Sequence, residues 1–544
     1  MKLLAAQINP IIGDIEGNVQ KILQALQRAK QQGCDLALFP ELAITGYPPE
    51  DLLLDHSFIR AAEKTLEQIL PMTIGLGAVI GLPRFNPRKK EKFLCNSAAI
   101  LQDGKLIGFK DKTLLPTYDV FDERRYFEPG EEVFVFEHLK RRIGVTICED
   151  IWTDAATLPY TQYERHPVLA LKEKKIDLLL NLSASPYFFK RKVARERICA
   201  SAAKNLSCPL LLCNQVGAND QLIFDGHSLF FNQKGELVQM AKGFVEDDLI
   251  VDFDAELPLC KTSGEPIEDL YQALVLGVRD YFHKQGFKKA LLGLSGGIDS
   301  ALVASIAKDA LGADQIEAFA LPSRFSSPQS YKDAALLAKN LGMQLREISI
   351  EPIFEVYLKL VHSEISTEPI GLVSENLQAR IRGMILMAIS NQTGALLLNT
   401  SNKSELAMGY STLYGDLCGA LGVLSDVTKM RIYELCHFLN RKREIIPESI
   451  FQRPPTAELR ANQTDQDTLP PFDVLDAIIE DYIEKGLSLE EIALQRGFEP
   501  SLIEEIVRKI HLAEYKRRQT SIGLRVTCKA FSKGRNVPIV QKWH

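Results

Sequence analysis

Three short segments in the first half of the chain each carry one reactive side chain at the end of an apolar run. Glu41 lies in L-F-P-E-L, Lys112 in F-K-D-K-T-L-L-P and Cys148 in G-V-T-I-C-E-D. A thiol needs a neighbouring base or cation to form a thiolate at neutral pH. Glutamate can take up and return that proton, and lysine can stabilise an oxyanion. The three side chains together suit hydrolysis of an amide through a thioester, although each alone is more often a surface charge or a core thiol.

A glycine-rich loop in the second half has the composition of a phosphate-binding site. It comprises Gly293, Leu294, Ser295, Gly296, Gly297, Ile298, Asp299 and Ser300. The loop follows a predicted strand at 290–294 and precedes a predicted helix at 300–311. Glycines let backbone N–H groups approach phosphate oxygens, and the positive end of a helix favours an anion. The alternative is a simple glycine-rich turn between strand and helix.

The pattern S-G-G-x-D-S in this loop resembles the N-type ATP pyrophosphatases, which form AMP. The loop lacks the G-K-[ST] of a Walker A motif. The resemblance implies that the loop binds the leaving pyrophosphate of ATP and that Asp299 is a ligand of Mg²⁺, for which a hard oxygen donor is suitable.

The length of the chain predicts two domains in the α/β class. A chain of 544 residues is too long for one hydrophobic core. We expect domains at 1–255 and 267–544, joined by a polar, proline-bearing linker at 256–266. In the first half, many short strands with intervening helices suggest a layered sandwich. In the second half, regular alternation of strands and helices predicts a doubly wound parallel sheet.

The composition excludes several classes of protein. The net charge of −6, from 64 Lys and Arg against 70 Asp and Glu, gives no electrostatic footprint for nucleic acid. No apolar run approaches the roughly 20 residues that span a bilayer. Ten cysteines without C-x-x-C pairs are typical of free thiols in a reducing cytoplasm.

The reactive segments of the first half resemble the nitrilase superfamily, including its element E-x-x-x-F-x-P-G, here Glu123 to Gly130. The resemblance implies an αββα sandwich. It also implies that Glu41 is a general base, that Lys112 supports the oxyanion and that Cys148 is the nucleophile. Glu123 would be a fourth, orienting acid.

A nitrilase-like amidase joined to an AMP-forming domain resembles the glutamine-dependent NAD+ synthetases over nearly the whole chain. The segments K-T-L-L-P-T-Y-D-V-F and N-L-S-A-S-P-Y-F-F-K-R support this resemblance. It implies that Tyr118, Ser185 and Arg191 bind glutamine. The family often has lysine at the last position, but arginine keeps the charge and suits a carboxylate.

The same resemblance extends to five segments of the second half: S-E-N-L-Q-A-R-I-R-G, N-T-S-N-K-S-E, L-S-D-V-T-K, R-P-P-T-A-E-L and E-Y-K-R-R-Q. It implies a Rossmann-like fold of the adenine nucleotide alpha hydrolase type. The implied ATP contacts outside the loop are Thr400, Lys429 and Thr456. The implied contacts of the dinucleotide are Asn376, Arg380, Glu405 and Lys516, with Glu405 also a second ligand of Mg²⁺.

Two features leave these second-half contacts less well defined. Smaller, ammonia-dependent relatives carry a G-T-D-type segment where this chain has N-T-S at 399–401. Asn376, Gln378 and Arg380 could also form the polar face of an amphipathic helix.

The resemblance implies a reaction in two parts. The carboxylate of deamido-NAD+ (nicotinic acid adenine dinucleotide) attacks the α-phosphate of ATP, and ammonia then displaces AMP to form NAD+. Glutamine hydrolysed at Cys148 supplies the ammonia, and the fusion of the two activities predicts an internal passage for it. The resemblance also favours a homo-oligomer.

Two other functions remain to be weighed. Another ATP-pyrophosphatase amidotransferase, acting on a different acceptor, would normally carry its cysteine in a G-x-C-x-G elbow or at the N-terminus, and neither occurs here. A DNA-binding regulator is suggested by helix-turn-helix spacing at 487–497 and 500–510. Glu504 and Glu505 lie where base contacts would be, so we expect packing helices instead.

Overall fold

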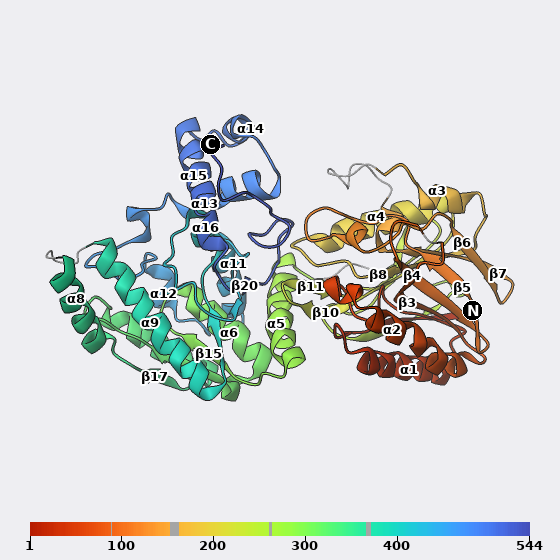
Figure 1. Ribbon diagram of the computed structural model, residues 1–544, viewed down its shortest axis with the longest axis horizontal. Coiled ribbons are helices and arrows are strands. Elements are labelled where there is room, and N and C mark those ends of the chain that lie inside the picture. The colour runs from red at the N-terminus through yellow and green to blue at the C-terminus, as the bar shows by residue number, and fades with distance from the viewer. Residues whose placement is uncertain (89, 153–162, 261–263, 366–370, 544) are drawn as a thin grey trace. The chain divides into compact units, whose positions relative to one another are not determined.

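The computed structural model describes residues 1–88, 90–152, 163–260, 264–365 and 371–543. The chain divides into two compact units, Met1–Glu265 and Pro266–His544 (Figure 1). Each unit has its own sheets and its own buried clusters of apolar side chains.

The first unit contains two six-stranded sheets and a short hairpin. In the order of the first sheet, its strands are β14 (Asp247–Asp252), β1 (Lys2–Gln7), β2 (Leu36–Leu38), β3 (Gly77–Phe85), β4 (Leu94–Gln102) and β5 (Lys105–Asp111). In the order of the second, they are β13 (Leu237–Met240), β12 (Leu229–Phe231), β9 (Leu210–Asn214), β8 (Leu178–Ser183), β7 (Arg141–Ile147) and β6 (Phe134–His138). The hairpin pairs β10 (Val216–Asn219) with β11 (Leu222–Asp225).

Helices cover the outer faces of these two sheets. The helices α1 (Ile15–Gln31) and α2 (His56–Ile69) lie on one side, and α3 (Pro167–Lys172) and α4 (Arg191–Leu206) lie on the other (Figure 1). The first unit is therefore the expected αββα sandwich.

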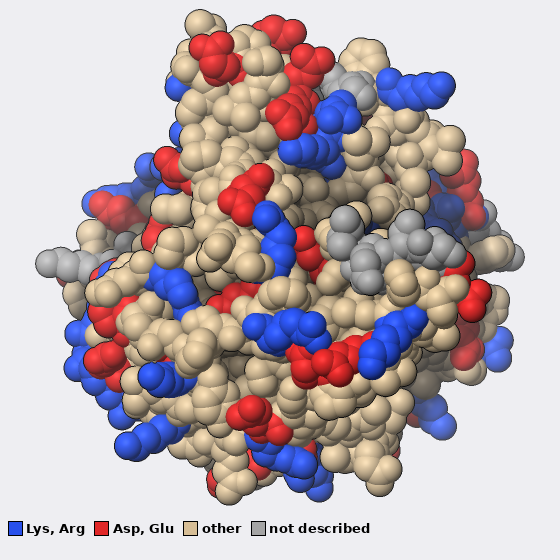
Figure 2. All heavy atoms as spheres, turned by 90° about the vertical axis from the view of Figure 1, so that its left-hand side faces the viewer, with Lys and Arg blue, Asp and Glu red and all other residues tan. Residues whose placement is uncertain are grey.

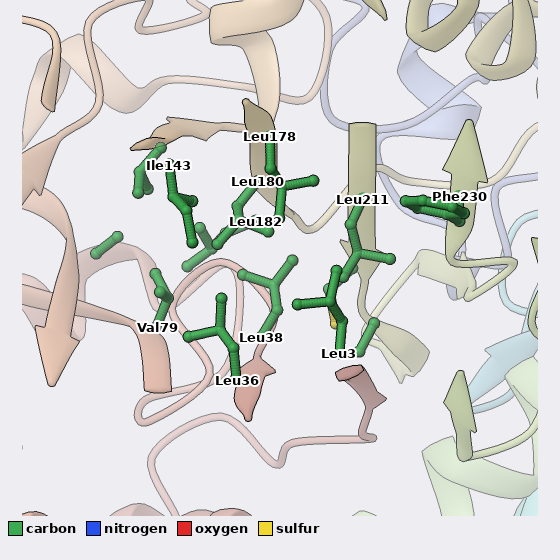
Figure 3. Close-up of a cluster of buried hydrophobic side chains, with 14 of the residues drawn as sticks. Leu3, Leu36, Leu38, Val79, Ile143, Leu178, Leu180, Leu182, Leu211 and Phe230 are labelled. Carbon is green, nitrogen blue, oxygen red and sulfur yellow. The ribbon is translucent and has the colours of Figure 1, made fainter. Parts of the chain in front are cut away.

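The packing of β1 shows why its sequence is apolar throughout. Successive side chains of a strand point to opposite faces. Leu3 and Ala5 accordingly join the core between the sheets, whereas Leu4 and Ala6 join the core beneath α1 and α2. Figure 3 shows the core between the sheets, where side chains of β1, β2 and β3 face those of β7, β8 and β9.

Three neighbouring strands of the second sheet, β7, β8 and β9, run parallel. Their carboxyl ends therefore meet at one edge of the sheet. Cys148 follows β7, Ser185 lies two residues after β8, and Asn214 ends β9. This edge gathers predicted site residues that are far apart in the sequence.

The second unit is built on one six-stranded sheet in which every pairing is parallel. In spatial order its strands are β17 (Leu345–Glu347), β16 (Ile316–Ala320), β15 (Ala290–Gly293), β18 (Leu396–Asn399), β19 (Leu421–Gly422) and β20 (Ile522–Gly523). The strand order changes direction between β15 and β18. Ligands of such sheets bind at the carboxyl ends of the strands beside this switch point.

Helices flank this sheet, as expected for a doubly wound fold (Figure 1). Leu386 of α9 (Leu372–Thr393) packs on Leu291, Phe319 and Leu397 of the strands. The other main helices are α5 (Pro266–Gln285), α6 (Ile298–Leu311), α7 (Pro328–Leu341), α8 (Glu351–Ile365) and α11 (Lys429–Asn440). Short helices are α10 (Lys403–Met408), α12 (Glu448–Gln452) and α16 (Glu514–Arg517).

The C-terminal part adds a helical subdomain to the second unit. It contains α13 (Phe472–Ile479), α14 (Leu489–Arg496) and α15 (Pro500–Leu512). Ile492 of α14 and Ile503, Ile506 and Val507 of α15 are buried in one cluster with α13. The two helices with helix-turn-helix spacing thus use their apolar faces for packing.

The surface carries mixed charge on the face shown in Figure 2, where Lys and Arg alternate with Asp and Glu without a continuous patch of either sign. In the described parts of the chain, no helix combines the length and the apolar composition needed to cross a membrane.

Candidate active sites

A buried lysine joins two buried carboxylates in the first unit. The ammonium nitrogen of Lys112 lies 2.6 Å from Oε1 of Glu41 and 2.8 Å from Oε1 of Glu123. Glu41 follows β2, Lys112 follows β5, and Glu123 begins a single helical turn at 123–125. All three side chains are at most 5% exposed. The fold thus brings together three of the four predicted catalytic residues by direct contact.

Three donors orient the carboxylate of Glu41. Besides Lys112, the amide of Asn96 donates to Oε1 at 2.7 Å, and the backbone N–H of Ala184 donates to Oε2 at 3.2 Å. Ala184 directly follows β8. The Glu41 carboxylate is therefore held by groups from both sheets of the sandwich.

Cys148 begins a tight turn at the end of β7. Its backbone has a φ of 43°, in the left-handed region that non-glycine residues rarely occupy. Such conformations persist where the surrounding structure fixes them, often at active sites. Burial raises the pKa of the Cys148 thiol, Glu41 raises it further, and Lys112 opposes both. Burial and Glu41 thus favour the thiol of Cys148 over the thiolate.

The two carboxylates beside Lys112 differ in their partners. Oε1 of Glu123 also accepts a hydrogen bond from the Tyr47 hydroxyl at 2.8 Å, whereas its Oε2 is buried without a partner in the described residues. Burial raises the pKa of Glu123 to about 7, with Lys112 opposing and Glu41 reinforcing the shift. Glu123 therefore takes up a proton near neutral pH.

Asp150 is a site residue that the sequence analysis missed. Its Oδ1 accepts the backbone N–H groups of Thr113 and Leu114, each at 2.9 Å, and its Oδ2 accepts that of Ile147 at 3.1 Å. The fully buried carboxylate thus ties the turn that carries Cys148 to the segment after Lys112. An acid two residues after the cysteine in an apolar segment was the available signal.

Polar and aromatic groups gather near Cys148 where glutamine is expected. Nη2 of Arg191 donates to the Ser185 hydroxyl at 3.3 Å, and the guanidinium lies 4.1 Å above the ring of Trp152. Burial, reinforced by Arg195, lowers the pKa of Arg191 to about 10. Nε of Arg191 is buried and has no hydrogen-bond partner in the part of the chain that the structure describes.

Glu149 is the second residue that the sequence analysis missed in this unit. It is buried, and its Oε1 accepts hydrogen bonds from the hydroxyls of Tyr118 at 2.7 Å and Tyr163 at 3.1 Å. Burial raises the pKa of Glu149. Glu149, which follows Cys148 in the chain, and Arg191, which begins α4, thus carry opposite charges.

In the second unit, the glycine-rich loop Gly293–Ser300 is closed by its own serines. The Ser300 hydroxyl accepts the backbone N–H of Ser295 at 3.3 Å and donates to the carbonyl of Gly297 at 3.0 Å. Gly297 is the N-cap of α6, so the helix begins at Ile298 rather than at Ser300 as predicted. The first turn of α6 therefore includes Asp299.

Lys429 forms the centre of an ionic cluster beside this loop. Its ammonium nitrogen lies 2.6 Å from Oδ2 of Asp299 and 3.8 Å from Oε1 of Glu405. The amide of Asn402 donates to Oδ1 of Asp299 at 2.9 Å. Burial, followed by repulsion from Asp299, raises the pKa of Glu405 to about 8. Burial disfavours the charge of Lys429, but Asp299 and Glu405 together raise its pKa.

Two cavities, of about 520 Å³ and about 470 Å³, adjoin the loop. Ser295 lines both. The larger cavity contains the predicted residues Gly297, Ile298, Asp299, Asn376, Arg380, Glu405, Lys429, Thr456 and Lys516. The smaller contains Gly293, Leu294 and Thr400, with apolar walls from Phe319, Leu321 and Leu386. Gly296 and Ser300 belong to the loop but line neither cavity.

The predicted dinucleotide residues are held by local hydrogen bonds. Oδ1 of Asn376 accepts the Thr412 hydroxyl at 2.8 Å, and Nε of Arg380 donates to the carbonyl of Leu413 at 3.2 Å. The ammonium of Lys516 donates to the carbonyls of Gly409 and Ser411. Burial lowers the pKa of Lys516.

Asp465 is a cavity residue that the sequence analysis did not single out. It lines the larger cavity with Asp299, Glu405 and Lys429, and it accepts the Tyr410 hydroxyl at 3.3 Å. Gln378, by contrast, is fully buried and donates to the carbonyl of Leu459 at 2.8 Å. The polar residues of α9 therefore divide: Asn376 and Arg380 line the cavity, whereas Gln378 packs inside the unit.

Comparison with known proteins links each unit to a family. The carbon-nitrogen hydrolase family matches residues 3–258, and the NAD synthase family matches residues 270–520. The glutamine-dependent NAD(+) synthetase of Synechocystis sp. is 46% identical, over 99% of this chain and 98% of its own length. That of Thermotoga maritima is 41% identical, over 100% of this chain and 99% of its own length.

A solved structure is similar over the whole chain. It is the glutamine-dependent NAD+ synthetase of Acinetobacter baumannii in complex with ADP, with 38% identity and a TM-score of 0.78. The match covers 100% of this chain and 99% of that one.

Proposed function

Because the chain belongs to the family of glutamine-dependent NAD+ synthetases, we propose that its two polar clusters divide one reaction between them. The enzyme hydrolyses glutamine to glutamate and ammonia, and uses ATP to convert deamido-NAD+ to NAD+ with release of AMP and pyrophosphate. We assign the glutaminase to residues 1–255, the synthetase to residues 267–544 and the linker to 256–266.

The cluster around Lys112 supports the glutaminase step. Glu41 takes the proton of Cys148 as the thiolate sulfur attacks the carboxamide carbon of glutamine. The ammonium of Lys112 stabilises the oxygen that becomes negative. Glu41 returns the proton to the departing ammonia, which leaves a thioester at Cys148. Glu41 then accepts a proton from the water that attacks the thioester and passes it to the departing sulfur of Cys148, which releases glutamate and restores the thiol.

The groups beside Cys148 provide recognition of the amino-acid end of glutamine. We assign the α-carboxylate to Arg191 and Ser185, since Nε of Arg191 is a donor without a hydrogen-bond partner among the described residues. We assign the α-ammonium to Glu149, whose charge is opposite. Tyr118, which orients Glu149, completes the pocket. These opposite charges select an amino acid over a simple amide.

The two cavities of the second unit suit ATP and the acceptor. The apolar walls of the smaller cavity fit the nucleoside, with Thr400 beside it, and the loop residues Gly293–Ser300 receive the phosphates. Lys429 and Thr456 contact the phosphates from the larger cavity. Asn376, Arg380, Glu405 and Lys516 then bind deamido-NAD+, so that its carboxylate faces the α-phosphate.

The carboxylates of the larger cavity fit a magnesium ion. Asp299 and Glu405 are hard oxygen donors, which Mg²⁺ prefers. Burial and the charge of Asp299 raise the pKa of Glu405, and a divalent cation would oppose both effects. When bound, the ion neutralises charge on the phosphates of ATP. Lys429 and Asn402 hold Asp299 in place on the protein side.

A homo-oligomer is supported by the exposed face of two helices. Val356 and Leu360 of α8 and Leu372, Val373 and Met384 of α9 are 45–70% exposed. Exposed apolar side chains gathered on one region often mark an interface. We propose that the synthetase units pair through this face, and that the protein acts in the cytoplasm.

The division of labour is tested by Asp299→Ala and Lys429→Met. Both variants should lose release of AMP in the presence of ATP, deamido-NAD+ and ammonium, while glutamine hydrolysis persists. Loss of glutamine hydrolysis to the same extent in folded protein would refute the assignment of separate sites.

A further inference from the structure

A strap of six residues, Arg453–Glu458, follows α12 and borders the larger cavity. Its sequence is R-P-P-T-A-E, and all six residues line the larger cavity. The middle of the strap carries Thr456, which we assigned to the phosphates of ATP. Its two ends carry charged residues, Arg453 and Glu458.

Arg453 anchors the first end of the strap to the phosphate loop. Its Nη2 donates to the carbonyl of Gly296 at 2.7 Å and to Oδ2 of Asp333 at 3.0 Å. Its Nη1 donates to the hydroxyl of Ser330 at 2.6 Å. Asp333 is buried and also accepts the Ser449 hydroxyl of α12 at 2.6 Å. One guanidinium thus joins the phosphate loop, α7 and the end of α12.

The bond to Gly296 fixes the orientation of one peptide group in the loop. In a trans peptide the carbonyl and the N–H point in opposite directions. Because Arg453 holds the carbonyl of Gly296, the N–H of Gly297 points the other way, where it donates to the Ser295 hydroxyl at 3.2 Å. Gly297 and Ser295 both line the cavity. Arg453 therefore orients a donor suited to a phosphate oxygen.

Gly296 itself has no room for a side chain. Gly296 has a φ of +78°, and a Cβ there would lie 2.1 Å from the carbonyl oxygen of Ser330. Any side chain is excluded, so the backbone of the loop packs directly on the first turn of α7. The position of that turn then determines the position of the loop.

Glu458 anchors the second end of the strap to the same turn of α7. Its Oε1 accepts the Ser330 hydroxyl at 2.6 Å, and its Oε2 accepts the backbone N–H of Ser327 at 3.1 Å. Ser330 accepts from Arg453 and donates to Glu458, so its one hydroxyl joins both anchors. Between the anchors, Pro454 and Pro455 restrict the backbone. Thr456 is thereby held at a fixed place beside the loop.

We propose that Arg453 and Glu458 are positioning residues that clamp the strap to the phosphate loop, so that Thr456 and the N–H of Gly297 bind the phosphates of ATP together. This inference rests on the proposed assignment of the loop and Thr456 to ATP. It adds to the synthetase site two residues that act by holding Thr456 and the loop rather than by touching ATP. Their loss weakens binding of ATP and of pyrophosphate and leaves the acceptor and glutamine sites intact.

The test compares Arg453→Met with Arg443→Met, which removes an exposed arginine from the segment before α12. Synthesis with ammonium is followed in both, with KM for ATP, KM for deamido-NAD+ and product inhibition by pyrophosphate. In Arg453→Met we expect KM for ATP and the inhibition constant of pyrophosphate to rise together by about tenfold or more, as for loss of a charge-assisted contact. KM for deamido-NAD+ and glutamine hydrolysis should stay within twofold of wild type.

A second measurement separates positioning from general damage. In Arg453→Ala, millimolar guanidinium chloride should restore part of the activity by occupying the vacated site, whereas equal sodium chloride should not. Glu458→Gln should raise the same two constants by a smaller factor. The proposal is overturned if Arg453→Met matches Arg443→Met, or if KM for deamido-NAD+ rises instead. Failure of wild-type protein to release AMP and pyrophosphate would instead overturn the proposed function.

Discussion

Replacing Lys112 by methionine tests the account of the glutaminase cluster most sharply, because the lysine neutralises two buried carboxylates at once. Its ammonium lies 2.6 Å from Glu41 and 2.8 Å from Glu123, and all three groups are buried. Methionine fills similar volume without charge. The variant leaves two carboxylates close together without their shared counter-charge.

The size of the effect follows from the burial of the cluster. Removing one partner of a buried ion pair costs about 3–5 kcal/mol of stability. At about 2–4 °C per kcal/mol for a domain of this size, the melting temperature of the first unit should fall by on the order of 10 °C. Loss of a group that stabilises the oxyanion should lower kcat for glutamine hydrolysis by about 10²–10³.

The loss of stability should depend on pH with a definite sign. The pKa of Glu123 is raised to about 7 although Lys112 opposes the shift, so its removal raises that pKa further. The native variant then binds a proton that the unfolded chain, with a carboxyl pKa near 4.3, releases. Stability of the variant therefore falls as pH rises. The difference from wild type should be larger at pH 8 than at pH 6.

The assay is thermal unfolding at both pH values, together with glutamine hydrolysis and ammonium-dependent synthesis. Lys105→Met, which removes an exposed lysine from β5, is the matched control. Ammonium-dependent synthesis should persist in both variants below the melting temperature. The reasoning is refuted if Lys112→Met has the same melting temperature as the control. It is also refuted if the loss of stability relative to wild type grows as pH falls.

Three further predictions follow from single contacts. Arg191→Met should raise KM for glutamine by about tenfold or more with a smaller change in kcat, since it removes a charged recognition group, and equal loss of both would contradict the assignment. Asp299→Asn should raise the Mg²⁺ concentration needed for half-maximal synthesis, and an unchanged requirement would remove Asp299 from the metal site. Burial lowers the pKa of His138 below that of the unfolded chain, so His138 should cost stability as pH falls from about 7 to 5. His138→Leu should flatten that part of the unfolding profile, and an unaltered profile would exclude His138 as its cause.

The fold was predictable from the sequence because the apolar patterns of strands and of helices are set by residues close together in the chain. Alternating strands and helices indicated the parallel sheet, and the position of the loop after Ala290–Gly293 indicated the ligand edge. The start of α6 was less predictable. The N-cap is glycine, which carries no side chain to mark the first turn, so the helix begins at Ile298 rather than at Ser300.

Proposed site residues within a recognisable motif could be singled out from the sequence, whereas those that act across elements could not. Glu41 and Lys112 stand out by their segments, although their contact joins residues 71 apart. Asp150 and Arg453 escaped notice because their roles come from backbone groups of other elements, such as Thr113 and Gly296. The acid beside the cysteine is visible in the sequence, but the backbone partners of Asp150 and Arg453 are found only from the tertiary structure.

The central claim is that hydrolysis of glutamine at Cys148 supplies ammonia to a synthetase that has its own separate site. The most direct test is NAD+ formation by wild type and Cys148→Ala from ATP and deamido-NAD+, first with glutamine and then with ammonium. Wild type should use both nitrogen sources. Cys148→Ala should form no NAD+ with glutamine and should match wild type with ammonium. Equal loss with both sources in a folded variant, or synthesis from glutamine without the thiol, would contradict the account.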